Sequence, residues 1–138
     1  MNWIDPRKAE CEQILQNLLS APLKHFDQEL PRTLPTRQGL YAISTIGAAE
    51  GEYLHVGKSK DGRNGLRGRV WDQHFQTGGS SGDLIEKVKK HGKAGSAREA
   101  KEYIRRNCQV QWVTLEDATS RGWAEHYILA VLRPLWGN

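Results

Sequence analysis

The chain has 138 residues, the usual length of one compact domain, and a formal net charge of +4. It lacks the run of about 18 apolar residues that a membrane span needs, and its N-terminal sequence MNWIDPRKAECEQ is too polar for a secretory signal. The two cysteines, Cys11 and Cys108, do not have the paired spacing of zinc or redox motifs. We therefore expect a soluble cytoplasmic protein with no membrane partner.

The positive charge is concentrated in the second part of the chain. Residues 1–54 carry five Lys or Arg and seven Asp or Glu, whereas residues 55–138 carry fifteen and nine. This distribution favours an anionic partner, and nucleic acid before a membrane surface. The alternative is that the basic residues form a solvated face with no ligand.

The first predicted element is a helix that begins at Asp5, because its side chain can cap free N–H groups and a proline, favoured in a first turn, follows it. This helix should end near Pro22. Residues 23–37 contain two prolines in PRTLPTR and predict an extended connector. We assign residues 1–36 to an N-terminal helical extension and residues 37–138 to the main domain.

Three β-rich segments follow. Residues 39–46 and 52–58 are joined by GAAEG, which has a glycine at each end and predicts a hairpin. Because side chains alternate between the two faces of a strand, Tyr41 and His55 can share one face of this hairpin. Residues 108–115 alternate as a third strand. The expected fold is α+β, with a small three-stranded antiparallel sheet flanked by helices.

Helices are predicted between and after these strands. They cover residues 65–76, the segment DLIEKVKKH, the segment AREAKEYIRRN and residues 118–132. Ser96 and Glu99 form a capping box before the third of these helices. The segment TGGSSG is predicted to be a flexible break.

Glu125 lies on the apolar stripe of the last predicted helix. Apolar residues follow it by three, four and seven positions, namely Ile128, Leu129 and Leu132. An unpaired charge on such a stripe costs on the order of several kcal/mol, so the carboxylate needs a cation or a metal. Two partners remain open at this point, a bound metal ion and Arg121 one turn earlier.

Five pieces of the sequence carry chemically useful residues in a fixed order. They are Gly39-Leu40-Tyr41, then His55-Val56-Gly57-Lys58-Ser59, then Arg69 with His74, then Glu125, and finally Pro134 to Asn138. In order and approximate spacing, this set resembles the GIY-YIG nucleases over residues 37–138. The resemblance does not cover the N-terminal extension.

The resemblance implies a role for each matched residue. Tyr41 matches the tyrosine that helps to deprotonate the attacking water, and Glu125 matches the carboxylate that binds one divalent metal, Mg²⁺ or Mn²⁺. Arg69 matches the arginine that contacts the scissile phosphate. Lys58 follows the glycine of the second motif, where some members use a lysine to help the tyrosine ionise. Asn138 matches a closing asparagine near the site.

Two positions of the matched set leave alternatives open. The second motif usually has a tyrosine where this chain has His55, which either transfers the proton or makes a structural hydrogen bond. Arg67 and Arg69 are two apart on one predicted helix and cannot both face the site, and we prefer Arg69. His74 is five residues beyond Arg69, which does not fit the four-residue step of a helix face.

The expected function is that of a metal-dependent endonuclease that cleaves DNA. The predicted nucleic-acid contacts are Lys58, Arg67, Arg69, His74, Lys89, Lys90 and Asn138. Two alternatives remain: a nuclease directed at RNA, and a nucleic-acid-binding module that keeps the fold without cleaving. The second alternative draws on the histidine in place of tyrosine and on the terminal position of the asparagine.

Overall fold

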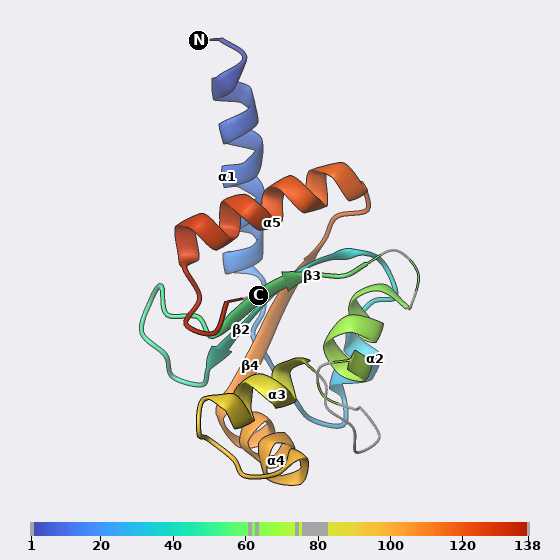
Figure 1. Ribbon diagram of the computed structural model, residues 1–138. Helices are drawn as coiled ribbons and strands as arrows, with labels where there is room; N and C mark the ends of the chain where they lie inside the picture. Colours follow the sequence, from blue (N-terminus) through green and yellow to red (C-terminus); the bar gives the residue numbers. More distant parts are fainter. Residues whose placement is uncertain (1, 61, 63, 74, 76–82, 138) are drawn as a thin grey trace.

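The computed structural model describes residues 2–60, 62, 64–73, 75 and 83–137. It is an α+β structure in which helices cover both faces of an antiparallel sheet with the strand order β1-β4-β2-β3 (Figure 1). Within the described ranges, no helix is long and apolar enough to cross a membrane.

The helices and strands follow one another in a mixed order along the chain. They are α1 (Ile4–Ser20), β1 (Lys24–His25), α2 (Leu30–Thr33), β2 (Gly39–Thr45), β3 (His55–Lys58), the π-helix η1 (Arg67–Gln73), α3 (Asp83–Lys90), α4 (Ala97–Asn107), β4 (Cys108–Thr114) and α5 (Ala118–Leu132). The predicted hairpin, the third strand and the last helix are confirmed. The predicted cap of α4 is also present, because the Ser96 side chain accepts a hydrogen bond from the Glu99 N–H.

The sheet has four strands, so the prediction of three was wrong. The additional strand is β1, which pairs antiparallel with β4 through Lys24 opposite Val110. A strand of two residues is too short to show an alternating pattern, and it lies in the segment that was predicted to be an extended connector. That segment also contains α2, where Pro31 is tolerated because it lies in the first turn.

The sheet separates two hydrophobic cores. On one face, Tyr41, Ile43 and Val110 pack with buried residues of η1, α3 and α4. On the other face, Leu40 packs with Leu18 of α1 and with buried residues of α5. The two sets of strand residues alternate because successive side chains point to opposite faces.

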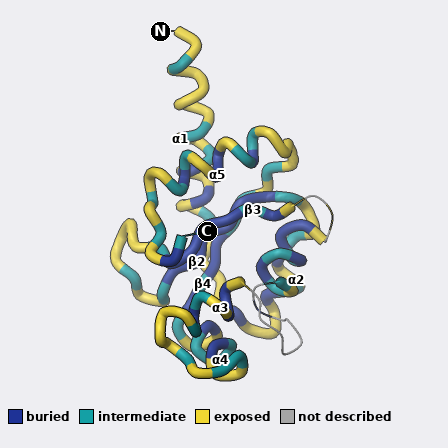
Figure 2. Tube along the Cα trace, in the orientation of Figure 1, coloured by how far each residue is buried: buried dark blue, intermediate teal, exposed yellow. Residues whose placement is uncertain are grey.

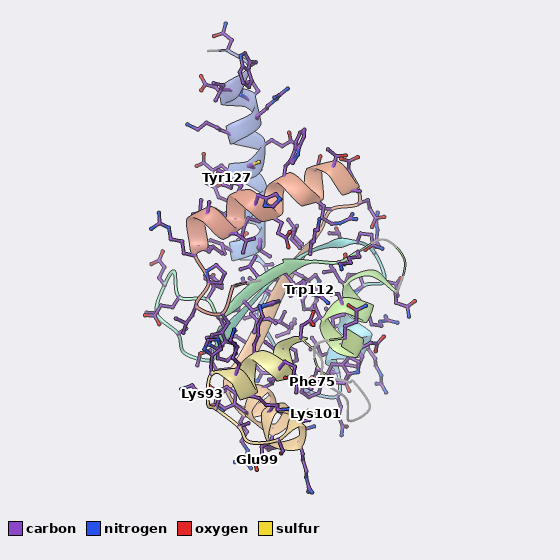
Figure 3. All side chains as sticks on the ribbon, in the orientation of Figure 1. Phe75, Lys93, Glu99, Lys101, Trp112 and Tyr127 are labelled. Atoms are coloured by element: carbon purple, nitrogen blue, oxygen red, sulfur yellow. The ribbon has the colours of Figure 1, made fainter. Side chains whose placement is uncertain are left out.

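The labelled side chains in Figure 3 show the same division. Phe75 belongs to the first core and Trp112 packs against it, whereas Tyr127, a residue of α5, packs against the second core. The N-terminal half of α1 extends away from the sheet and is mostly exposed (Figure 2). The predicted helix over residues 65–76 is present as the π-helix η1, and the predicted break TGGSSG lies outside the described residues.

Candidate functional site

The centre of the site is the pairing of Tyr41 with Gly57 across strands β2 and β3. The tyrosine ring passes over the glycine so closely that a Cβ atom at position 57 would lie 2.5 Å from Tyr41 Oη. Glycine is therefore required opposite this tyrosine. Since β3 is the outer strand of the sheet, the hydroxyl group lies at the sheet edge.

Tyr41 and His55 are both completely buried and in contact. Tyr41 Oη lies 3.2 Å from His55 Nε2, so the two groups predicted to share a face do so. Burial raises the pKa of Tyr41 above its ordinary value, although the nearby Arg69 guanidinium opposes this shift. Burial, together with the charges of Lys87 and Arg69, lowers the pKa of His55 to about 3. Both side chains are therefore neutral near pH 7.

Arg69 brings a positive charge to the Tyr41 hydroxyl. Its guanidinium interacts with the Tyr41 side chain and forms a 2.9 Å ion pair with Asp83 at the start of α3. It also donates to Gln73 Oε1 at 2.8 Å. Arg67 points elsewhere, because its Nε donates to the Leu34 carbonyl at 3.1 Å. Of the two arginines on η1, Arg69 is therefore the one whose described contacts reach the site.

Lys87 of α3 is part of the same cluster, although it was not among the predicted site residues. Its Nζ lies 3.1 Å from His55 Nδ1 and donates to the Trp136 carbonyl at 2.9 Å. The residue belongs to a basic stretch that looks like solvated surface in the sequence. One feature of the sequence indicates that Lys87 faces the site. It follows Leu84 by three positions, so it lies next to the buried apolar face of the helix.

Glu125 approaches the site from α5, on the other face of the sheet. The residue is 7% exposed, and no hydrogen bond or ion pair joins its carboxylate to any other residue that the structure describes. Its negative charge adds to the effect of burial in raising the pKa of Tyr41. A buried carboxylate without a protein partner is costly unless a cation binds it.

Arg121 does not provide that cation. Its Nε donates to the Ser59 carbonyl at 3.2 Å, and its Nη1 donates to the carbonyls of Leu115 and Glu116, both at 3.0 Å. The guanidinium thus joins the backbone segments that follow β3 and β4, at the end of the sheet where β2 begins. No ion pair between Arg121 and Glu125 occurs among the described residues.

Glu125 could contribute only a single carboxylate ligand to a metal ion. In the part of the chain that the structure describes, no group of three or more His, Cys, Asp or Glu side chains is placed to hold a metal ion. Mg²⁺ can bind to a protein through only one or two carboxylates, because it keeps most of its water molecules and takes phosphate oxygens as further ligands. A carboxylate such as that of Glu125 is a ligand of the type that Mg²⁺ takes, and Mn²⁺ prefers the same type of oxygen ligand.

Lys58 lies on the Glu125 side of the sheet. It pairs with Leu40, so its side chain points to the face opposite Tyr41. Its Nζ lies 3.6 Å from the position that a Cβ atom on Gly122 would occupy, one turn before Glu125. The site is therefore assembled around the edge of β3, with Tyr41 on one face and Glu125 and Lys58 on the other.

The C-terminal segment covers one part of this edge. The N–H groups of Leu135 and Trp136 donate to the carbonyls of Tyr53 and Leu54 at 2.8 and 2.7 Å, and the Val56 N–H donates to the Gly137 carbonyl at 3.2 Å. These bonds run along the strand as far as Val56. The end of β3 that follows is where the Tyr41 hydroxyl lies.

The remaining predicted contacts are spread more widely. Lys89 and Lys90 lie on α3, where Lys90 is exposed and Lys89 forms a 3.5 Å ion pair with Glu86. They carry positive charge on the helix that also presents Lys87 to the site. His74 and Asn138 lie outside the described residues.

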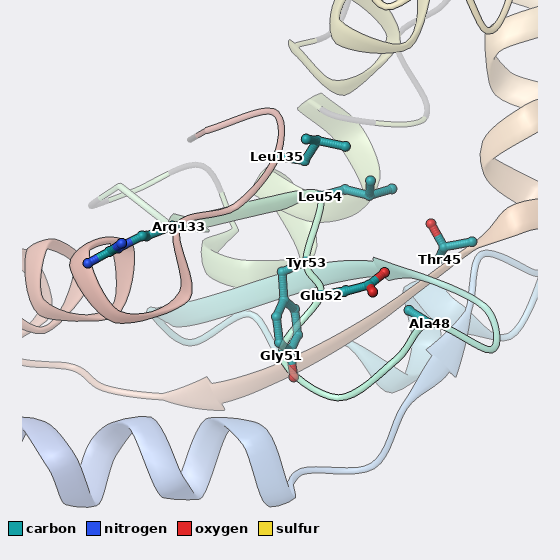
Figure 4. Close-up of a pocket in the computed structure, with 8 residues that line it drawn as sticks. All are labelled: Thr45, Ala48, Gly51, Glu52, Tyr53, Leu54, Arg133 and Leu135. Atoms are coloured by element: carbon teal, nitrogen blue, oxygen red, sulfur yellow. The ribbon is translucent and has the colours of Figure 1, made fainter.

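A separate cavity of about 290 Å³ lies beside the loop that joins β2 and β3 (Figure 4). It is lined by Thr45, Ala48, Gly51, Glu52, Tyr53, Leu54, Arg133 and Leu135. None of the residues predicted to act in catalysis, metal binding or nucleic-acid binding lines this cavity. The chemically equipped site is thus the cluster around Tyr41, and the cavity is a separate feature.

Comparisons of the chain with protein-family models, with curated proteins and with solved structures found no match. Function is therefore inferred from the geometry and the chemistry of the site.

Proposed function

We propose that the protein is a metal-dependent endonuclease of the GIY-YIG type that hydrolyses phosphodiester bonds in DNA. The observation that carries this proposal is the arrangement at the β3 edge. There a buried tyrosine in contact with an arginine interacts with a carboxylate that has no partner among the residues that the structure describes. Phosphodiester hydrolysis requires removal of a proton from water, stabilisation of an anionic transition state and neutralisation of the leaving oxygen. The site offers a group for each requirement.

Tyr41 is the proposed base. A phenol with its ordinary pKa of about 10 is a poor base at neutral pH, and burial raises that pKa further. The Arg69 guanidinium acts in the opposite direction, because its positive charge and its hydrogen bond favour the phenolate. Arg69 is therefore expected to stabilise both the phenolate form of Tyr41 and the negative charge that develops on the phosphate.

His55 supports Tyr41 and is not the proton acceptor in this proposal. With its pKa lowered to about 3, the imidazole stays neutral across the physiological range. A base with so low a pKa has little tendency to take a proton from water. Its contact with Tyr41 Oη fits the role of holding the tyrosine in place.

Glu125 and Lys58 serve the other side of the site. Glu125 would hold Mg²⁺ or Mn²⁺, which when bound supplies a Lewis acid for phosphate oxygens. Lys58 places a second positive charge near the same helix, where it can attract the DNA backbone. A buried carboxylate with no partner among the described residues favours an enzyme over a simple binding module, since a protein that only binds DNA does not need a buried negative charge.

The direct test is a cleavage assay on single-stranded DNA, double-stranded DNA and RNA of one sequence, with Mg²⁺, with Mn²⁺ or with a chelator. We expect the wild-type protein to cut DNA only when a metal is present. Cleavage of RNA but not of DNA would assign the protein to the RNA-directed alternative. Binding of DNA without cleavage under every metal condition would contradict the proposed activity and support a binding module.

A further inference from the structure

Three side chains form a continuous hydrogen-bonded chain from the surface of α3 to the proposed base. Lys87 Nζ lies 3.1 Å from His55 Nδ1, and His55 Nε2 lies 3.2 Å from Tyr41 Oη. The Trp136 carbonyl accepts a hydrogen bond from the same Lys87 Nζ at 2.9 Å and so orients it. The proposed function assigns no task to Lys87.

The donors and acceptors in this chain determine which histidine nitrogen carries the proton. A neutral imidazole has one N–H donor and one acceptor nitrogen, whereas an ammonium group has donors only. Lys87 therefore donates to Nδ1, and the proton of His55 is left on Nε2. The neighbouring carboxylate of Asp83 favours the charged form of Lys87, although burial has the larger effect and lowers its pKa.

We propose that Lys87 is a positioning residue that holds His55 in the tautomer with Nε2 protonated, so that His55 donates its hydrogen bond to Tyr41 Oη. Tyr41 then does not donate its own O–H to the histidine. Once the tyrosine proton is lost, the phenolate keeps two donors, the His55 Nε2–H and Arg69. In the opposite tautomer the phenolate oxygen would face a nitrogen lone pair instead, which would destabilise it.

The tautomer can be measured without any assay of activity. In protein labelled with ¹⁵N-histidine, long-range ¹H–¹⁵N NMR spectra distinguish the two ring nitrogens, and a His55→Gln variant identifies the signals. We expect Nε2–H in the wild type and a shift toward Nδ1–H in Lys87→Met. Lys90→Met removes a charge from the same helix and should leave the tautomer unchanged. An Nδ1–H tautomer in the wild type, or no change in Lys87→Met, would overturn the proposal.

The consequence for catalysis rests on the proposed function and is measured separately. Lys87→Met should lower kcat by about ten- to a hundred-fold with little change in KM, because a donor to a charged oxygen is lost. Lys87→Arg keeps a donor and should recover part of the rate, with thermal unfolding of both variants confirming that they fold. A wild-type kcat in Lys87→Met would rule out a contribution of Lys87 to catalysis. A protein that cleaves nothing but shows the expected tautomers would contradict only the nuclease function.

Discussion

Gly57 lies directly opposite Tyr41 in the β2–β3 pairing, and the tyrosine ring occupies the space that any side chain at position 57 would need. A Cβ atom there would approach Tyr41 Cζ to 2.8 Å, closer than such contacts normally become. The hydroxyl reaches the sheet edge only because this strand position has no side chain. The glycine and the tyrosine therefore act as one structural unit.

Gly57→Ala should displace the Tyr41 ring. Overpacking of this kind usually lowers the free energy of unfolding by about 1–3 kcal/mol, and the shifted hydroxyl should cost most of the cleavage activity. Chemical denaturation and the cleavage assay measure both effects. Gly95→Ala is the matched control, since an added Cβ there makes only an ordinary contact, 3.8 Å from Glu99 Oε2. Equal stability of the two variants would show that the Tyr41 ring moves aside freely.

Tyr41→Phe removes the proposed base without changing the shape of the ring. We expect the cleavage rate to fall by about 10²- to 10⁴-fold, with DNA affinity retained because no phosphate-contacting charge is lost. Tyr53→Phe is the control on the same hairpin. The Tyr53 hydroxyl donates to Gln111 Oε1 over 3.4 Å and takes no part in the site. Single-turnover rates compare the three proteins. A Tyr41→Phe enzyme as active as Tyr53→Phe would rule out the assignment of the base.

Glu125→Gln keeps the shape of the side chain and removes its charge. Cleavage should be abolished and Mn²⁺ binding lost, while the melting temperature stays the same or rises because the carboxylate has no partner among the described residues to lose. Calorimetric titration and thermal unfolding test these two points, with the exposed Glu12→Gln as control. A clear fall in melting temperature would mean that Glu125 is held by an ion pair after all.

The buried histidine predicts how stability depends on pH. An unfolded histidine has a pKa near 6.5, whereas the pKa of His55 in the folded protein is about 3. Between these values the unfolded state binds a proton that the folded state does not. The free energy of unfolding should therefore fall as the pH drops from about 6.5 toward 3, by up to roughly 1.4 kcal/mol per pH unit from this group.

His55→Gln removes that contribution. Denaturant unfolding between pH 7 and pH 4 should give a wild-type stability that falls more steeply than that of the variant. The other histidines are the same in both proteins, so their contributions cancel in the comparison. Parallel curves would show that His55 accepts a proton in the folded state.

The basic residues of α3 predict a salt-dependent DNA affinity. If Lys89 and Lys90 contact phosphates, the double charge reversal to Glu should reduce the slope of log affinity against log salt by about one to two. Lys90 should contribute more, because Lys89 already pairs with Glu86 at 3.5 Å. Lys8→Glu on the exposed part of α1 is the control for net charge. The same slope in all variants would identify these lysines as solvated surface only.

Local patterns in the sequence predicted the elements with a strong periodic or capping signal. The hairpin, the strand after α4, the capping box at Ser96 and the helix that carries Glu125 all follow from spacing over a few residues. The shared face of Tyr41 and His55 also follows from strand alternation alone. The strand β1 was missed because two residues show no alternation, and it forms only by pairing with β4, far along the chain.

The sequence by itself determined which side chains point to which face of each strand and helix. Only the tertiary structure decided which of them meet. Lys58 follows Gly57 in the chain but lies on the opposite face from Tyr41, whereas Lys87, 32 residues beyond His55, contacts the histidine. The physical reason is that periodicity acts within one element, while contacts between elements depend on how α3 and α5 pack against the two faces of the sheet.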